Sequence, residues 1–382
     1  MVHAGFRSAA QGDVGFMIGH RMTTSRTRRG SLDKVGDGIY WVNDNPREEG
    51  VAASLSDVAE RAGVSIKTVS GALHGGSARM SEETRLRIKQ IAEELGYVTN
   101  LAARGVRQGW LPLIGVVADE LITSPFATEI IRGLDGAART AEMAVFAMNL
   151  NGTRDVASVL EEVRRFRPRA IAYAAMYHKT VALPEAFAAN VGIMINCSEA
   201  TGRVTSLVPD DESAAFDVTR HLLTAGRRRI AFINLPGLLA GELRERGFRR
   251  ALDEAGIAPI GIMPAVRRPI YTDRAPSMVG THIAGLMNAS ESPDAILCGN
   301  DRVAMEVYSA LRRAGARIPD DVAVGSFDNQ VEIATRLDPP LTTMALPHRA
   351  MGRVAAEMLL SEKIVPPHTR RLPFQLISRS SV

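Results

Sequence analysis

The sequence predicts a small α-helical domain near the N-terminus and a larger α/β domain after it. Helix-capping residues and helical periodicity between positions 54 and 99 indicate the first domain. Apolar runs that alternate with amphipathic helical stretches from position 111 onward indicate the second. At 382 residues the chain is too long for one ordinary domain and suits two or three, so its length fits this division.

Two short helices around a tight turn are expected at positions 54–74. Ser54 and Asp57 have the spacing of a capping box and stand directly before an apolar run. Gly63 can end the first helix, because a left-handed position accepts glycine without a Cβ clash. Ser65 can cap the second helix.

The second of these helices has two different sides. Val69 and Leu73 are four residues apart and are expected to pack on the first helix. The remaining side chains would point outward or flank that contact, as they do when a helix-turn-helix motif enters a major groove. These residues are Ile66, Lys67, Ser70, Gly71 and His74.

A third helix is expected to complete a three-helix core. Ser81 can open this helix and Gly96 can end it. Its apolar face is expected to consist of Leu86, Ile88, Ile91, Ala92 and Leu95.

Residues 1–53 show no sustained periodicity, and we expect a disordered extension. One alternative is a basic arm that touches DNA phosphate through Arg26, Arg28 and Arg29. Another is a translation start further downstream, at Met22.

The segment 100–110 is expected to be a short helix or a plain interdomain linker. Asn100 is a good helix N-cap and Gly109 a good stop. Gly105 in the middle costs about 1 kcal/mol relative to alanine. So short a helix would be marginal in water by itself.

The remaining part of the chain predicts parallel sheets covered by helices on both faces. About 270 residues are many for one such sheet, so two stacked lobes with a cleft between them are expected, with ligands at the carboxyl ends of the strands. Strands are expected at 113–118, 144–150, 170–176, 192–196, 229–235, 295–300, 322–327 and 341–346. Helices are expected at 127–141, 212–226, 243–256 and 302–315.

The charge and cysteine content of the chain limit how it could bind DNA, a metal or a redox partner. The net charge is only +4, and residues 54–110 carry eight Lys and Arg against six Asp and Glu, so DNA affinity would depend on where these charges are placed. Cys197 and Cys298 lie in apolar runs and are expected to be small buried residues.

No secretion signal or membrane-spanning run is present, so a cytoplasmic protein is expected. The histidines are dispersed and no catalytic, phosphate-binding or metal motif is found, so no catalytic residue, metal or cofactor is expected.

The run D-V-A-x-x-A-G-V-S-x-x-T-V-S, the third helix ending in L-G-Y, and the following N-x-x-A-R resemble the DNA-binding region of lactose-repressor-type (LacI/GalR) transcription regulators. Residues 111–382 resemble the periplasmic-binding-protein-like effector domain of the same family. The resemblance implies a helix-turn-helix domain at 54–99, a hinge helix at 100–110, and a two-lobed α/β effector domain. Residues 1–53 lie outside it.

The resemblance also implies where the chain passes between lobes, namely near Arg227–Ile230, Asp338–Leu341 and Pro366–Arg371. The first lobe would then comprise about 111–228 and 340–367, and the second about 229–339 and 368–382. A dimer is expected, because no C-terminal heptad helix follows the last strand.

In the second helix of the helix-turn-helix, bases would be contacted by Ile66 and Lys67. Phosphate or sugar would be contacted mainly by Thr68, Ser70 and Arg104, and Ser65 and His74 are also expected at the DNA. In the hinge, the resemblance implies contacts from four residues. Val106 matches the residue that levers a base step apart in the minor groove, and Ala103 matches the contact between two hinge helices. The other two are Asn100 and Arg104.

One departure from the family pattern affects DNA recognition. Gly71 stands where relatives usually carry an arginine that contacts guanine. The main hypothesis remains a homodimeric, sequence-specific regulator, a repressor by family habit, controlled allosterically by a small polar effector, with a sugar as the expected class. The alternative is a soluble sugar-binding module whose head has lost operator specificity.

Five residues match effector-binding positions of the family. Arg244 is expected to bind a pair of ligand hydroxyls or a carboxylate, although it could pair with Glu242 or Asp253. Asp301 is expected to accept hydrogen bonds from ligand hydroxyls, although it could merely cap its helix. The other three are Phe126, Asp211 and Asp328.

Overall fold

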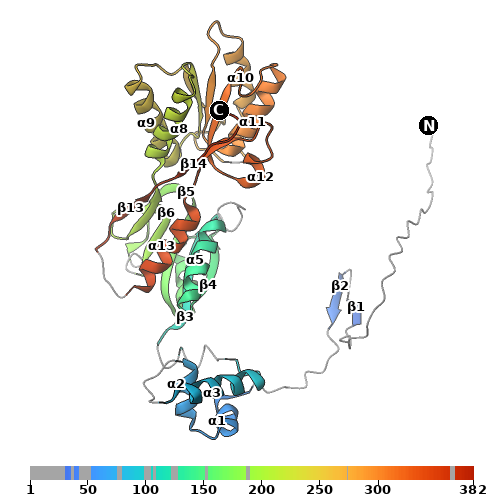
Figure 1. Cartoon of the computed structure of the whole chain (residues 1–382), viewed down its shortest axis with the longest axis vertical. Coiled ribbons are helices and arrows are strands. Elements are labelled where there is room, and N and C mark those ends of the chain that lie inside the picture. Colours follow the sequence, from blue (N-terminus) through green and yellow to red (C-terminus); the bar gives the residue numbers. More distant parts are fainter. Residues whose placement is uncertain are drawn as a thin grey trace, which may run out of the picture. The chain divides into compact units, whose positions relative to one another are not determined.

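The chain divides into two compact units, Met1–Thr99 and Asn100–Val382. Figure 1 shows the computed structural model. It describes residues 31–35, 38–42, 53–74, 80–98, 105, 109–121, 128–150, 154–185, 190–272, 274–361 and 366–382.

Three helices form the head, which we define as residues 53–98. They are α1 (Leu55–Ala62), α2 (Ile66–His74) and α3 (Glu82–Glu94). The predicted capping box of α1 is present in both directions between Ser54 and Asp57. Gly63 ends α1 in the left-handed conformation at φ 66°, which confirms the predicted turn.

The core of the head contains residues of all three helices, including Val58, Val69 and Ile88. Two expectations about it are wrong. Leu86 is 59% exposed, because it lies two residues, or about 200° around the helix, from buried Ile88. Gly71, expected to point outward or flank the contact, is buried.

Two arginines of α3 satisfy carbonyl groups at the ends of the other two helices. Arg87 donates to the carbonyl of Ala62 at 2.5 Å, and Arg85 lies 3.5 Å from the carbonyls of Gly71 and Ala72. The last carbonyls of a helix lack partners within it, so these side chains act as C-caps.

The N-terminal region contains a feature that the sequence did not predict. Strands β1 (Ser31–Val35) and β2 (Gly38–Val42) pair antiparallel, within a stretch expected to be disordered. The segment GIYWV is rich in β-branched and aromatic residues, which favour strands.

The second unit contains two six-stranded sheets, each covered on both faces, which confirms the predicted two-lobed α/β architecture (Figure 1). The first lobe is the sheet in the order β13-β7-β6-β5-β3-β4 and its helices, and all of its strand pairs are parallel. Helices α5 and α13 cover one face and α6 the other. The bounds are β3 Leu111–Asp119, β4 Ala144–Leu150, β5 Pro168–Val181, β6 Ile193–Glu199, β7 Ser206–Pro209, β13 Thr369–Leu372, α5 Thr128–Thr140, α6 Val156–Arg165 and α13 His348–Leu360.

The second lobe is the sheet in the order β14-β12-β11-β10-β8-β9 and its helices. Among its described strands, the β12–β14 pair is antiparallel and the others are parallel. Helices α8 and α9 lie on one side and α10 and α11 on the other (Figure 1). The bounds are β8 Ile230–Asn234, β9 Gly261–Pro264, β10 Ala295–Cys298, β11 Ala323–Asp328, β12 Thr342–Ala345, β14 Gln375–Ile377, α8 Asp211–Thr224, α9 Leu239–Glu254, α10 Val279–Met287, α11 Asp301–Arg313 and α12 Val331–Ala334.

The passages between the lobes differ from the expected positions. The first follows β7 at Pro209, well before Arg227, because α8 packs in the same core as Phe232 of the second sheet. The second follows β12, which pairs with β11, and therefore comes after the expected 338–341. The third follows β13, which still pairs with β7 of the first sheet, and therefore comes after the expected 366–371.

Close packing fixes the helix pair α5 and α13 of the first lobe. A Cβ atom on Gly352 would lie 2.0 Å from the carbonyl oxygen of Ile130, and one on Gly133 would lie 2.1 Å from that of Arg349. At the edge of the same lobe, the guanidinium of Arg169 lies 4.9 Å from the ring centroid of Trp110.

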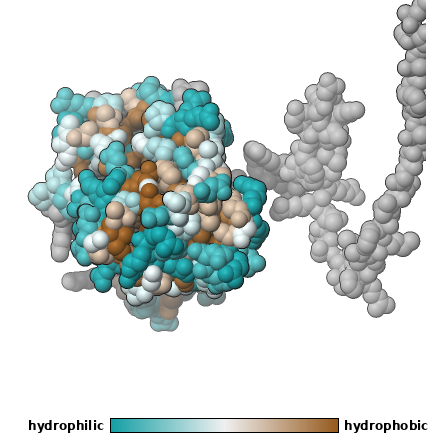
Figure 2. Space-filling model, turned by 90° about the horizontal axis from the view of Figure 1, so that it is seen from above, coloured by the Kyte–Doolittle hydropathy of each residue, from teal (hydrophilic) through white to brown (hydrophobic). Residues whose placement is uncertain are grey.

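The surface seen from the second-lobe end is mainly hydrophilic, with apolar residues in separate groups (Figure 2). No helix within the described residues is long and apolar enough to cross a membrane. Cys197 and Cys298 are both fully buried, as predicted.

Candidate functional site

The N-terminal turn of α2 presents the side chains expected to contact bases. Ile66 is 52% exposed although it is a large apolar residue, and Lys67 beside it is also exposed. Ser65 accepts the amide hydrogen bond of Thr68 at 3.1 Å, and the two hydroxyls are 2.8 Å apart. This cap fixes the start of α2, which in turn fixes the direction of Ile66 and Lys67.

Other predicted DNA contacts are described only in part. Ser70 is half-buried on α2, and His74 is the last residue of that helix, although its side chain lies outside the described part of the structure. Asn100, Ala103, Arg104 and Val106 also lie outside the described residues.

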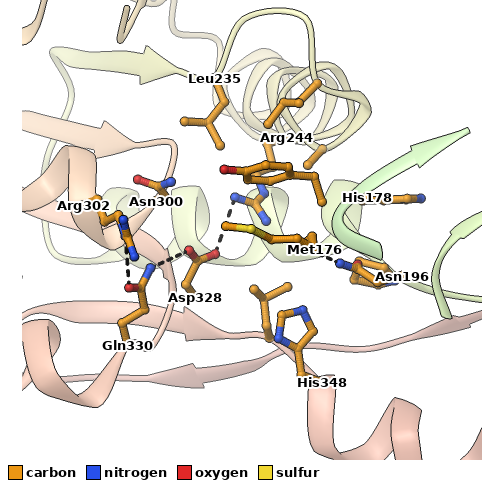
Figure 3. Close-up of a pocket in the computed structure, with 15 residues that line it drawn as sticks. Met176, His178, Asn196, Leu235, Arg244, Asn300, Arg302, Asp328, Gln330 and His348 are labelled. Atoms are coloured by element: carbon orange, nitrogen blue, oxygen red, sulfur yellow. Dashed lines mark hydrogen bonds and ion pairs between the residues drawn. The ribbon is translucent and has the colours of Figure 1, made fainter. Parts of the chain in front are cut away.

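A pocket lies between the two lobes (Figure 3). The first lobe supplies Met176 and His178 from β5, Asn196 from β6 and His348 from α13. The second lobe supplies Arg244 from α9, Asn300 and Arg302 at the start of α11, and Asp328 and Gln330 at the carboxyl end of β11. The pocket therefore stands at the carboxyl ends of parallel strands, as the sequence predicts for such sheets.

Arg244 is tightly held in this pocket. It is 3% exposed, and its Nε donates to Oδ1 of Asp211 at 2.7 Å. One terminal nitrogen donates to the Gly299 carbonyl at 2.5 Å and lies 4.0 Å from Oδ1 of Asp328. The guanidinium also lies 4.4 Å from the ring centroid of Phe327. These contacts place the side chain in one orientation, with its terminal nitrogens toward Asp328 (Figure 3).

Asp211 joins the two lobes. It is 1% exposed, and its second oxygen lies 2.7 Å from Nδ1 of His178 on the first-lobe strand β5. Asp211 is the first residue of α8, directly after the first passage between the lobes. Both of its oxygens are therefore used by protein groups, and it fixes Arg244 relative to β5.

Asp328 is a buried carboxyl group with incomplete charge compensation. Burial raises the pKa of Asp328, and the Arg244 guanidinium offsets only part of this effect. Gln330 Nε2 donates to Oδ2 of Asp328 at 3.1 Å. Because Arg244 already pairs with Asp211, hydrogen-bond donors from a ligand would stabilise the ionised form of Asp328.

Asn196 offers a hydrogen-bond acceptor at the first-lobe wall. Its Nδ2 donates to the carbonyls of Ala175 and Met176 at 3.0 and 2.8 Å. Its Oδ1 is buried and has no hydrogen-bond partner among the described residues. A hydroxyl or amide hydrogen of a ligand can satisfy this atom.

Comparison with known proteins gives a family match for each of the two units. Residues 54–100 match the family described as bacterial regulatory proteins, lacI family, and residues 219–382 match a periplasmic binding protein-like domain. The sucrose operon repressor of Escherichia coli is 35% identical over 335 residues, which cover 86% of this chain and 99% of that protein. The chain belongs to the lacI family of bacterial regulatory proteins.

Solved structures agree with this assignment. A putative LacI-family transcriptional regulator from Rhizobium etli has a TM-score of 0.65 and 31% identity, and the match covers 71% of this chain and 98% of that one. The lac repressor dimer bound to operator has a TM-score of 0.66 at 23% identity over 86% of this chain and 98% of that one, which shows the shared fold. The chain is a DNA-binding transcriptional regulator.

Only some of the five residues expected to bind the effector line the pocket of the described structure. Arg244 and Asp328 line the pocket. Asp211 does not line the pocket itself but contacts two residues that do, Arg244 and His178. Asp301 is fully buried outside the pocket lining, and its oxygens accept hydrogen bonds from Gln330 N and Thr343 Oγ1. Phe126 lies outside the described residues.

Sequence reasoning missed several pocket residues. His178 was missed because the predicted strand ended at Met176, whereas β5 continues to Val181 after a register shift against β6. Asn196 was included only as the last residue of a predicted strand. Arg302 directly follows the predicted site residue Asp301, and Gln330 stands two residues after Asp328. No signal in the sequence separates Arg302 and Gln330 from ordinary surface positions.

Proposed function

We propose that the chain is a homodimeric repressor that binds a pseudo-palindromic operator and is controlled by a sugar bound between its lobes. It acts in the cytoplasm and catalyses no reaction. One observation carries the proposal: the same chain combines a helix-turn-helix head with an interlobe pocket in which Arg244 and Asp328 face each other. The sucrose operon repressor, similar over nearly its whole length, supports a sugar as the effector class.

The chemistry of the pocket suits a polyhydroxylated ligand. Arg244 can donate two hydrogen bonds to neighbouring hydroxyl oxygens, Asp328 can accept from hydroxyl groups, and Asn196 has a free acceptor. Aliphatic side chains of Met176 and Leu235 line the same pocket and can pack against the C–H face of a sugar ring.

In the head, we assign base contacts to Ile66 and Lys67, and phosphate or sugar contacts to Ser65, Thr68 and Ser70. His74 and the hinge residues Asn100, Ala103, Arg104 and Val106 complete the proposed interface. Two heads would bind together, because the modest positive charge of one head supplies few phosphate contacts.

The control is a two-state equilibrium. Effector binding favours one relative position of the two lobes, and the segment 100–110 transmits that preference to the paired heads. The effector shifts operator affinity only by the difference between its affinities for the two states. The His178–Asp211 contact crosses between the lobes, so it is one of the contacts that this equilibrium would change.

The test is selection of bound duplexes from a random library with the purified full chain at about 150 mM salt, a concentration that suppresses nonspecific binding. We expect enrichment of a palindrome with a flexible central step. Sugars, sucrose first, are then added to the bound complex, and we expect one of them to change operator affinity. A selected operator whose affinity responds to no sugar would contradict the effector class but not the DNA-binding function.

The variant Lys67→Ala distinguishes the specific regulator from a sugar-binding module with a degenerate head. A specific regulator should lose about 1–3 kcal/mol at its own operator and little on random DNA. Lys89→Ala is the matched control, because Lys89 is exposed on α3 rather than α2. If the unmodified chain enriches no sequence with or without sugars, the degenerate-head alternative, motivated by Gly71, holds.

A further inference from the structure

The turn after β11 has an unusual backbone. Asp328 and Asn329 have φ values of 107° and 53°, although neither is glycine. Such left-handed residues cost on the order of 1–3 kcal/mol each and persist only where the surroundings hold them. Asp328 and Gln330 on either side of Asn329 both line the pocket, so the shape of this turn decides where their side chains point (Figure 3).

Two residues of the second lobe hold the main chain of this turn. Asp301, at the start of α11, accepts a hydrogen bond from the Gln330 amide at 2.6 Å and one from the Thr343 hydroxyl at 2.8 Å. The Asn329 amide donates to the Thr343 hydroxyl at 3.4 Å. This explains why Asp301, expected to touch the effector, is fully buried outside the pocket lining.

A third contact comes from the segment after β14. Arg379 donates from one terminal nitrogen to Oδ1 of Asn329 and from the other to the carbonyl of Leu341, both at 2.7 Å. Its backbone amide donates to the Thr342 hydroxyl at 2.9 Å. Arg379 is thus fixed to the strand β12 beside the turn, and it does not line the pocket.

We propose that Arg379 is a positioning residue of the effector pocket: through Asn329 it holds the strained turn that directs Asp328 and Gln330 toward the ligand. The planar guanidinium is suited to this role, since its two terminal nitrogens reach two acceptors in fixed directions, which a lysine ammonium cannot do. A charged donor also makes a stronger bond to the Asn329 side chain than a neutral one would.

The effect on effector affinity rests on the proposed function, whereas the positioning itself can be measured without any ligand. Hydrogen exchange of the full chain reports the Asn329 and Gln330 amides directly, because both are bonded within the turn. We expect Arg379→Ala to raise exchange of these two amides about tenfold. Exchange of the buried β11 amides before the turn should not change.

Ser381→Ala is the matched control. Ser381 fastens the same segment through bonds to the Val324 carbonyl at 2.6 Å and the Thr342 amide at 2.8 Å, but it does not contact Asn329. We expect this variant to lower overall stability without selective loss of protection at the turn. Equal exchange in Arg379→Ala and the unmodified chain, or an equal selective increase in Ser381→Ala, would overturn the proposal.

A double-mutant cycle tests whether the effect passes through Asn329. In an Asn329→Ala background, Arg379→Ala should no longer change exchange at Gln330, because the link is already lost. Asn329→Asp, which keeps an acceptor for Arg379, should retain protection. An undiminished effect of Arg379→Ala in the Asn329→Ala background would show that Arg379 acts by another route.

Calorimetric titration with the sugar that binds the unmodified chain adds the functional readout. We expect about a tenfold rise of Kd in Arg379→Ala and an unchanged Kd in Ser381→Ala. If no sugar binds the unmodified chain, the proposed effector class fails, while the exchange experiments still decide whether Arg379 holds the turn. An unchanged Kd together with increased exchange would overturn the role of Arg379 in binding.

Discussion

The head and the interlobe pocket are built in opposite ways. The surface of α2 that we propose to contact bases comes from a few consecutive residues, and local caps at Ser54 and Ser65 set its geometry. The pocket combines side chains from segments more than a hundred residues apart in the sequence, such as His178 and Arg302. The head surface therefore depends on one small core, whereas the pocket depends on the packing of two whole lobes.

The largest effect is expected from Ile88→Ala, which tests whether the two regions are independent. Ile88 is 1% exposed in the small core of the head, and its truncation should cost about 3 kcal/mol there. We expect a separate early unfolding transition and loss of operator binding, with sugar binding unchanged. Calorimetry with Leu86→Ala as control checks this, since Leu86 is largely exposed. Loss of sugar binding together with loss of operator binding would contradict the independence of the head and the interlobe pocket.

A second prediction concerns the dependence of the pocket on remote packing. Gly352→Ala should destabilise the effector domain by about 2 kcal/mol, because the new Cβ would meet the Ile130 carbonyl. Gly136→Ala on α5 is the control: it has open space around its Cβ and should be neutral or slightly stabilising. Urea denaturation measures both. Equal stability of the two variants would show that α5 and α13 separate without cost.

Asp328→Asn should show opposite effects on stability and on binding. Because burial raises the pKa of Asp328 in the folded chain, its contribution to stability is present at low pH and is lost as pH rises through the folded-state pKa. The variant should therefore gain at least about 1 kcal/mol at pH 8 relative to the unmodified chain, and little near pH 4.

The same substitution should weaken sugar binding. A ligand that donates hydroxyl hydrogens to ionised Asp328 binds better as pH rises, so the unmodified chain should show increasing affinity between about pH 5 and pH 8. The variant should lack this dependence. Thermal unfolding and titration at several pH values check both effects, and an identical pH profile in the two proteins would refute the role assigned to Asp328.

The smallest effect is expected from Ser54→Ala in the head. Loss of the capping box should cost about 1 kcal/mol of head stability, because the Asp57 amide and the start of α1 lose their partner. Operator affinity should fall slightly and sugar binding should not change. Chemical denaturation followed by helical circular dichroism measures the change. A stability equal to that of the unmodified chain would show that Asp57 alone suffices.

This contrast also explains what the sequence could predict. The helix caps at Ser54 and Ser65 and the Gly63 turn are properties of neighbouring residues, and these expectations were confirmed. The alternating pattern of strands and helices likewise predicted the two-lobed fold. The short edge strands β9 and β13 were missed because four-residue strands leave little periodic signal.

Pocket residues could be predicted from the sequence only where they match a position at which the family commonly carries a charged ligand-binding residue. Arg244, Asp211 and Asp328 were identified, but the pairing of Asp211 with Arg244 and its interlobe contact to His178 follow from tertiary packing. Asp301 illustrates the limit, because a carboxylate at the start of a helix looks the same in sequence whether it faces a ligand or fastens a neighbouring turn. The chain passes between the lobes before α8 rather than after it, because Val218 of α8 is buried in the core of the second lobe. The sequence does not show which lobe buries this residue.

Trp110 gives the regulator an optical signal of its own. The chain contains only two tryptophans, Trp41 and Trp110, and Trp110 lies directly before β3, where the segment 100–110 joins the first lobe. The Arg169 guanidinium over its ring is a charge whose displacement changes indole fluorescence. In a Trp41→Phe background, fluorescence emission comes from Trp110 alone and reports changes around this residue in real time. Stopped-flow mixing with operator and effector can therefore measure how fast binding at one site changes the surroundings of Trp110.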